Sequence, residues 1–181
     1  MSIDKSLPFF EIKVALPEGV DAYLEGSLLT IKGPLGKCSK DFSKIPVKIS
    51  KVDNQLIIQS YKRKKRDYSI INTTYSHIKN MIRGVTKGYT YRLKIVYAHF
   101  PVSVKVKGKE VYIENFYGER APRVAKIVGD CQVSIEGEDV VVRGVSKEDV
   151  GQTAANIELA TRVKRKDPRV FLDGIYIYAK E

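Results

Sequence analysis

The chain has 181 residues, which is enough for one domain or two small ones. Hydrophobic residues make up 43% of it, which excludes an intrinsically disordered protein. Its 32 Lys and Arg residues outnumber 21 Asp and Glu, so the formal net charge is +11. This excess attracts polyanions, of which nucleic acid is the commonest, although a basic protein without such a partner is the alternative.

Targeting and cofactor signals are absent from the sequence. No stretch approaches the roughly 18 apolar residues that a membrane span needs, and residues 1–10 carry Asp4 and Lys5 instead of an apolar signal segment. Cys38 and Cys131 are too few for a disulfide framework and lack the spacing of zinc ligands. We therefore expect a soluble, cytoplasmic protein with no membrane partner, metal or other cofactor.

An internal repeat organises the chain, with a shift of 82 residues between copies. Apolar positions and glycines recur at this shift: Val20, Leu24, Gly26, Leu29, Ile31 and Gly36 match Val102, Val106, Gly108, Val111, Ile113 and Gly118. In both copies the apolar positions alternate with polar ones on either side of a glycine-containing turn. This pattern predicts a β-hairpin in each copy.

A helix is expected to close each copy. In the first, Asp67 is the expected start and Gly84 the expected end, with Ile71 and Ile78 on the apolar face. In the second, Ser146 is a good N-cap, and apolar residues keep helical spacing as far as Thr161.

These elements predict an α+β fold made of two tandem duplicated domains, each a small antiparallel sheet packed on one helix. We place the first domain at residues 1–86 and the second at residues 87–181. Between them, the strand pattern Tyr89–Tyr97 is expected to run from one half to the other.

The cations are unevenly distributed. Residues 1–86 contain 15 Lys and Arg against 8 Asp and Glu, and residues 87–181 contain 17 against 13. Two clusters stand out as candidates for binding a phosphate backbone, although a solvated charged face is the usual meaning of such runs. The first cluster precedes the first helix: Lys62, Arg63, Lys64, Lys65 and Arg66. The second follows the second helix: Arg162, Lys164, Arg165, Lys166 and Arg169.

The second cluster is the stronger candidate. Pro168 and the apolar, strand-like run after Arg169 restrain it, so less conformational entropy is lost on binding than for a free tail. Another candidate contact is Tyr117, which lies close to Arg120 and Arg123 on a glycine-containing loop. An aromatic ring beside arginine can stack on a base, although such a tyrosine more often packs at a sheet edge.

Catalytic motifs are missing. His77 and His99 lie in different segments, with no Ser or Cys motif beside either, and the glycines do not form a phosphate-binding loop. An enzyme that uses one of these histidines is therefore the weaker hypothesis, and no small-molecule substrate is expected.

Three stretches resemble the large-subunit ribosomal protein L6 family. They are Leu16–Gly36, with its Lys-Gly-Pro-Leu-Gly turn; Asn80–Pro101, which ends in Tyr-Ala-His-Phe-Pro; and Lys164–Tyr176, with Asp-Pro-Arg-Val-Phe-Leu-Asp-Gly-Ile-Tyr. The tail differs from the Pro-Glu-Pro-Tyr-Lys-Gly-Lys-Gly type of bacterial members. It is similar to the archaeal and eukaryotic branch, and the absence of long basic extensions favours an archaeal-type member.

The resemblance implies a duplicated α+β fold and a structural role in the large ribosomal subunit. It also implies binding to large-subunit rRNA at the base of the flexible stalk and near the sarcin–ricin loop, where translation factors dock beside neighbouring ribosomal proteins. A module that binds other RNA or DNA, or an acidic protein, through the same basic surface is the alternative.

Overall fold

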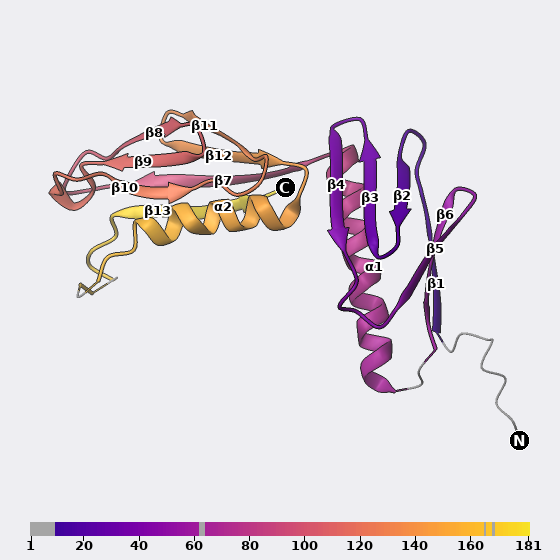
Figure 1. Ribbon diagram of the computed structural model, residues 1–181. Coiled ribbons are helices and arrows are strands. Elements are labelled where there is room, and N and C mark those ends of the chain that lie inside the picture. Colours follow the sequence, from indigo (N-terminus) through magenta and orange to yellow (C-terminus); the bar gives the residue numbers. More distant parts are fainter. Residues whose placement is uncertain (1–9, 62–63, 165, 168) are drawn as a thin grey trace, which may run out of the picture. The chain divides into compact units, whose positions relative to one another are not determined.

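The computed structural model describes residues 10–61, 64–164, 166–167 and 169–181 (Figure 1). The chain divides into two compact units, Met1–Lys87 and Gly88–Glu181, which we call unit 1 and unit 2. The division falls one residue after the boundary expected at residue 86. Lys62, Arg63, Arg165 and Pro168 lie outside the described residues.

The described residues of unit 1 form two antiparallel three-stranded sheets and one helix. One sheet has the order β1-β6-β5 and the other β2-β3-β4. In chain order the elements are β1 (Phe10–Ala15), β2 (Asp21–Glu25), β3 (Leu28–Gly33), β4 (Gly36–Asp41), β5 (Lys48–Val52), β6 (Gln55–Ser60) and α1 (Lys65–Thr86).

Helix α1 packs against strands of both sheets of unit 1. It buries Ile71 and Ile78 completely, together with Met81 and Val85. The apolar residues of β3 and β6 that complete this core are Leu29, Ile31, Leu56 and Ile58. The apolar face predicted for the first helix is therefore the face that closes unit 1.

The ends of α1 differ from the prediction. The helix begins at Lys65, not at Asp67, because Asp67 occupies the third helical position and its carboxylate accepts a hydrogen bond from the Lys64 amide (3.2 Å). It continues past Gly84 to Thr86, because Gly84 is buried on the packed face and has no left-handed backbone that would end a helix.

In unit 2, the part of the chain that the structure describes likewise forms two antiparallel sheets and one long helix. One sheet has the order β10-β9-β8, and the other has four strands in the order β11-β12-β7-β13. In chain order the elements are β7 (Tyr89–Val96), β8 (Ser103–Lys107), β9 (Glu110–Glu114), the 3₁₀ turn η1 (Phe116–Gly118), β10 (Arg123–Lys126), β11 (Gln132–Glu136), β12 (Asp139–Gly144), α2 (Lys147–Ala160) and β13 (Gly174–Lys180).

The strand predicted to connect the halves is instead the second strand from one edge of the unit 2 sheet. Strand β7 pairs with β12 on one side and with β13 on the other. Leu93 on β7 is fully buried and belongs to the same core as Ile157 of α2 and Ile175 of β13. The alternating pattern was recognised correctly, but its role as a link was wrong, because a strand's partners do not appear in its local sequence.

The two units repeat the same plan. In each, a hairpin turns at a glycine with positive φ, Gly26 (+62°) in unit 1 and Gly108 (+59°) in unit 2. The α+β fold with two tandem duplicated domains is therefore confirmed, with two small sheets per domain where one was expected. Among the residues that the structure describes, no helix has the length and apolar composition to cross a membrane.

Candidate nucleic-acid interface

The second basic cluster lies on a loop that leaves α2 and returns as β13, at one end of unit 2 (Figure 1). We call residues 162–172 the basic loop. Its described cations, Arg162, Lys164, Lys166 and Arg169, are all exposed to solvent. Strand β13, which follows the basic loop, begins only at Gly174. The apolar run after Arg169 predicted an earlier start, but Val170 and Leu172 remain exposed in the loop.

The base of the basic loop is closed by Thr161, directly after the last residue of α2. The Thr161 side chain is buried, and its hydroxyl donates to the Glu158 carbonyl (3.0 Å). The same oxygen accepts a hydrogen bond from the Ile175 amide (3.0 Å). The end of the helix and the start of β13 are therefore joined by one side chain. Helix α2 itself begins as predicted, because the Asp149 amide donates to the Ser146 hydroxyl.

Asp173 fixes the returning end of the basic loop. Its buried carboxylate accepts hydrogen bonds from the amides of Ala98 (3.0 Å) and His99 (3.3 Å), and it lies 3.1 Å from His99 Nδ1. Burial by itself raises the pKa of Asp173, but the hydrogen bonds from His99 and Ala98 outweigh burial and hold the pKa below its ordinary value. Asp173 is therefore a charged anchor within the fold.

Three aromatic rings connect this anchor to the loop that contains Tyr117. The His99 ring stacks on Phe171 at a centroid distance of 4.8 Å, and the rings of Tyr117 and Phe171 form a T-shaped pair at 5.2 Å. Tyr117 has a left-handed backbone (φ +59°), which is uncommon for a residue with a side chain. The structure thus brings Tyr117 to the basic loop, as part of a small aromatic cluster.

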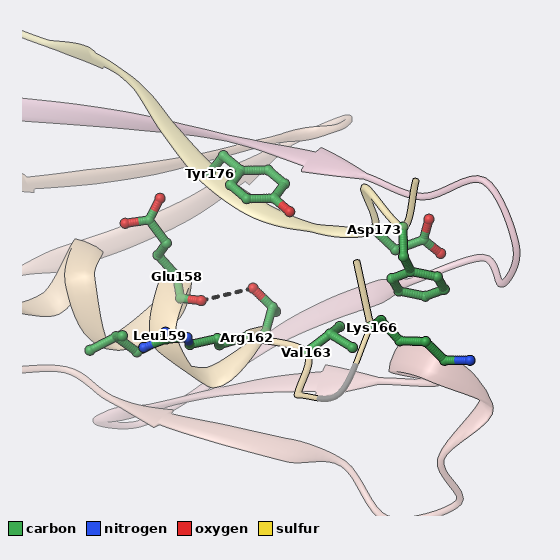
Figure 2. A pocket seen from close by; sticks show the side chains of 9 residues that line it. Glu158, Leu159, Arg162, Val163, Lys166, Asp173 and Tyr176 are labelled. Atoms are coloured by element: carbon green, nitrogen blue, oxygen red, sulfur yellow. Dashed lines mark hydrogen bonds between the residues drawn. The ribbon is translucent and has the colours of Figure 1, made fainter. Parts of the chain in front are cut away.

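Two grooves flank the segment where α2 runs into the basic loop. One, of about 500 Å³, lies toward β13 and is lined by Arg162, Lys166, Phe171 and Tyr176, among other residues (Figure 2). The other, of about 560 Å³, lies toward β10 and is lined by Tyr117, Arg162 and Lys164, among others. Each groove combines cations with aromatic rings, the combination that binds phosphates and bases of single-stranded nucleic acid.

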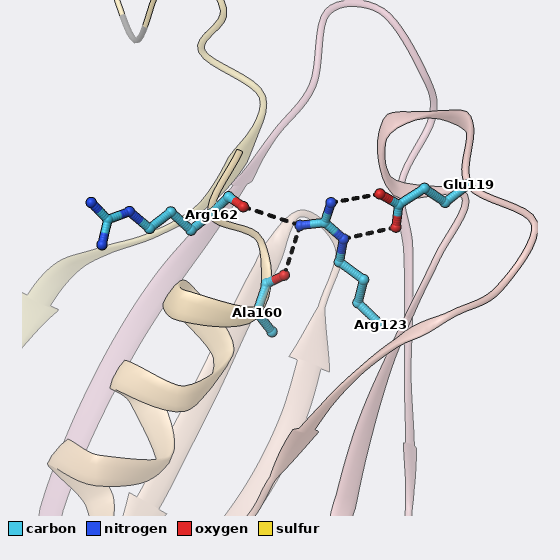
Figure 3. A network of polar contacts seen from close by, with 4 residues as sticks. All are labelled: Glu119, Arg123, Ala160 and Arg162. Atoms are coloured by element: carbon cyan, nitrogen blue, oxygen red, sulfur yellow. Dashed lines mark hydrogen bonds and ion pairs between the residues drawn. The ribbon is translucent and has the colours of Figure 1, made fainter. Parts of the chain in front are cut away.

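Arg123, predicted as an RNA contact, is engaged inside the protein (Figure 3). Its Nε and one terminal nitrogen donate to the two carboxylate oxygens of Glu119, at 2.8 and 2.6 Å. Its other terminal nitrogen donates to the carbonyls of Ala160 (3.0 Å) and Arg162 (3.2 Å). The hydrogen bonds with Arg123 lower the pKa of Glu119, and the same bonds raise the pKa of Arg123.

The remaining predicted cations divide into paired and unpaired groups. Arg169 is exposed but its guanidinium forms a 2.8 Å ion pair with Asp167, only two positions away. Among the described residues, no carboxylate lies within ion-pair distance of the three basic-loop cations that line the grooves, Arg162, Lys164 and Lys166. The same holds for Arg120, which is exposed but lines neither groove. Carboxylates of Glu119, Glu158 and Asp173 also line the grooves, but they form no ion pair with these cations, which leaves the cations available to a polyanion.

The first basic cluster belongs to unit 1 and has a different setting. Lys64 precedes α1, whereas Lys65 and Arg66 lie in its first turn, and all three are exposed. Cations at a helix N-terminus oppose the helix dipole, so this placement does not favour helix stability. The cluster and the basic loop lie on separate units.

Sequence reasoning missed Glu119 and Asp173 because neither belongs to a basic motif. In the sequence, Glu119 is recognisable only as a carboxylate four positions before Arg123. The two side chains pair here although Glu119 follows a turn and Arg123 begins a strand, so they do not lie along one helix. Asp173 meets His99 across 74 positions, and no local pattern indicates that contact. No group of three His, Cys, Asp or Glu residues is arranged to hold a metal ion in the described part of the chain.

The fold and this end of unit 2 define a duplicated α+β protein with a basic, aromatic-lined surface. The family model described as "Ribosomal protein L6" matches residues 16–88 and 100–174. The chain therefore belongs to the ribosomal protein L6 family, as the sequence motifs predicted. This is a family of structural proteins, which confirms the prediction that the chain is not an enzyme.

Curated relatives come from archaea, in agreement with the archaeal-type tail. The protein named large ribosomal subunit protein uL6 of Sulfurisphaera tokodaii is 48% identical over 98% of this chain and 95% of its own length. The protein of the same name from Methanobrevibacter smithii is 47% identical over 93% of this chain and 95% of its own. That of Ignicoccus hospitalis is 47% identical, covering 93% of both chains.

Proposed function

We propose that this protein is a structural constituent of the large ribosomal subunit and binds large-subunit rRNA through the basic loop and its two grooves. The observation that carries the proposal is the set of unpaired cations around the grooves, on a loop fixed at both ends. Family membership supports the ribosomal context, because the curated relatives are named as large-subunit proteins.

The mechanism is electrostatic and geometric. Arg162, Lys164 and Lys166 neutralise RNA phosphates and release the counterions condensed on them. Because Thr161 and Asp173 hold the ends of the loop, the cations start from fixed positions and less ordering entropy is lost on binding. Phosphate contacts of this kind recognise the shape of the RNA backbone more than its base sequence.

The finer location is also part of the proposal. We infer that unit 2 lies near the base of the stalk and the sarcin–ricin loop, beside neighbouring large-subunit proteins and close to the surface where translation factors dock. In this role the protein works in the cytoplasm and holds RNA segments in a fixed relation, without chemistry of its own. The resemblance of the tail and of Asn80–Pro101 to the L6 family supports this location.

The test is a competition experiment with the full chain bound to transcribed large-subunit rRNA of Methanobrevibacter smithii. We expect unlabelled large-subunit rRNA to compete far better than duplex DNA or small-subunit rRNA of equal charge. Equal competition by duplex DNA or by an acidic protein would favour the alternative, a general polyanion-binding module. No binding to large-subunit rRNA at low salt would refute the proposal.

A further inference from the structure

Four of the five N–H groups of the Arg123 guanidinium donate hydrogen bonds inside the protein. Its hydrogen bonds go to both oxygens of Glu119 and to two backbone carbonyls, and its carbon lies 4.6 Å from the centroid of the buried Phe116 ring. The side chain is 25% exposed. A group with this many partners is held in one geometry by the protein itself.

The carbonyls that Arg123 binds are at the point where α2 ends and the basic loop begins. Ala160 is the last residue of α2, and Arg162 is the first residue of the basic loop. Carbonyls at a helix C-terminus lack partners within the helix, and an arginine that binds them also complements the helix dipole. Arg123 therefore sets the direction in which the chain leaves the helix.

Glu119 holds Arg123 in this position. The two-point contact between the carboxylate and the guanidinium fixes the plane of the guanidinium, which a single contact does not do. Glu119 follows the η1 turn, and its amide donates to the Phe116 carbonyl (3.1 Å). The pair thus connects the η1 turn to the start of the basic loop, while Asp173 connects the other end to residues 98–99.

We propose that the Glu119–Arg123 pair is a positioning element for the basic loop, and that Arg123 is not itself a phosphate ligand. The inference rests on the proposed function, since it assigns a role within the same RNA-binding surface. The two roles for Arg123 predict opposite signs for one substitution. If Arg123 binds phosphate, removing the charge of Glu119 frees it and strengthens RNA binding. If the pair positions the loop, the same substitution weakens binding, although the protein becomes more positive.

The experiment measures the affinity of Glu119→Gln for large-subunit rRNA of Methanobrevibacter smithii, together with hydrogen exchange of peptides covering residues 160–172. We expect affinity to fall about threefold to tenfold, because the loop must now be ordered on binding. Exchange at the start of the loop is expected to accelerate. The salt dependence of binding should keep its slope, because no phosphate contact is removed.

The matched control is Glu114→Gln. Glu114 is a carboxylate of the same unit whose recorded partners are Lys105 (2.6 Å) and Ser103 (3.3 Å), neither of which belongs to the basic loop. This variant changes the net charge by the same amount, so it should bind rRNA as well as the wild type or slightly better. Glu119→Asp is a second test variant. It keeps the charge but shortens the side chain, and it should lose affinity as Glu119→Gln does.

Unchanged or tighter binding by Glu119→Gln, with unchanged exchange in the loop, would overturn the positioning role. The failure of the proposed function is a separate result: the wild type itself would not bind rRNA. In that case the exchange comparison alone still decides whether Glu119 and Arg123 hold the loop.

Discussion

Units 1 and 2 share a plan of two sheets and one helix, but they differ in the segment that comes after the helix. After α1, Lys87 and Gly88 lead directly into β7. After α2, residues 161–173 form the basic loop and its anchors, and β13 then pairs with β7 at the edge of the sheet. Strand β13 has no counterpart among the described strands of unit 1. The basic loop thus lies in a part of the chain that is not repeated, although the grooves beside it are also lined by residues of the repeated part, such as Tyr117 and Leu159.

Total charge does not single out the unit that contains the candidate site. Residues 1–86 have the larger excess of cations, 15 against 8 carboxylates, whereas residues 87–181 have 17 against 13. In unit 2 several cations off the loop are paired, such as Lys94 with Glu138 and Asp139. Arg162, Lys164 and Lys166 line the grooves without an ion pair in the described chain. The local placement of these cations, on a loop with anchored ends, favours unit 2 as the candidate RNA-binding unit more than net charge does.

The largest effects are expected from removing one core isoleucine in each unit. Ile157 on α2 and Ile78 on α1 are both fully buried, so Ile→Ala should lower the free energy of unfolding of the affected unit by about 2–5 kcal/mol. Hydrogen exchange resolves the units: Ile157→Ala should expose β11 and β12, and Ile78→Ala should expose β5 and β6. Only Ile157→Ala should lose rRNA affinity, in proportion to its loss of stability. Equal loss in both variants would contradict the assignment of binding to unit 2.

The next effect is on rRNA binding itself. Replacing Arg162, Lys164 and Lys166 with Ala should lower affinity about 30-fold and reduce the salt slope by about two to three. The matched variant removes three exposed lysines from unit 1 (Lys37, Lys44 and Lys48) and should change both quantities much less. Filter binding across a salt series measures both. A larger loss in the unit 1 variant would move the site to unit 1.

A smaller effect is expected from Asp173→Asn. The amide cannot replace a carboxylate that accepts hydrogen bonds from two amides and faces His99, so the free energy of unfolding should fall by about 1–3 kcal/mol. Urea unfolding measures this loss. Asp130→Asn is the control, because the side chain of Asp130 is fully exposed and its contact with Lys109 is long, at 4.0 Å.

Wild type and Asp173→Asn also test how the free energy of unfolding depends on pH. The pKa of Asp173 is lowered in the folded state, so the charged carboxylate stabilises the fold at pH values above the ordinary Asp pKa of about 3.9. This contribution is lost as the pH falls through the lower, folded pKa. The difference between wild type and Asp173→Asn should therefore shrink in acid. A difference that stays constant down to acid pH would show that the carboxylate charge is not what anchors the loop.

The smallest effects concern the two repeated hairpins. Gly26 and Gly108 both have left-handed backbones, and no atom lies within 4 Å of an added Cβ at either position. Replacing either with Ala should cost about 1–2 kcal/mol from backbone strain alone. Thermal unfolding, monitored in each unit by hydrogen exchange, should give similar losses of stability for the two variants. Clearly unequal costs would show that the two hairpins are not equivalent.

Much of the scaffold could be predicted because it depends on local patterns. Glycine turns between alternating strands marked the hairpins at Gly26 and Gly108, and Ser146 marked the start of α2. The start of α1 was wrong because Asp67 bonds back to Lys64 from inside the helix, where a sequence cannot distinguish it from a cap. The strand at Tyr89–Val96 was predicted correctly, but its role as a link between the halves was wrong because partner strands are chosen by tertiary packing.

The site was less predictable, because its geometry depends on contacts between distant segments. The cations of the basic loop were visible as a cluster, but the same reasoning counted Arg123 among the RNA contacts. The structure engages its guanidinium with Glu119 and with carbonyls 37 and 39 positions away. The anchoring of the loop by Asp173 likewise depends on residues of the segment between β7 and β8.

The most direct test of unit 2 as the RNA-binding unit is lysine footprinting by acetylation, with and without large-subunit rRNA of Methanobrevibacter smithii. Lys164 and Lys166 on the basic loop are compared by mass spectrometry with the exposed Lys37 and Lys48 of unit 1. We predict that rRNA protects Lys164 and Lys166 strongly and leaves Lys37 and Lys48 reactive. The assignment of RNA binding to unit 2 would be contradicted if rRNA protected Lys37 and Lys48 and left Lys164 and Lys166 reactive.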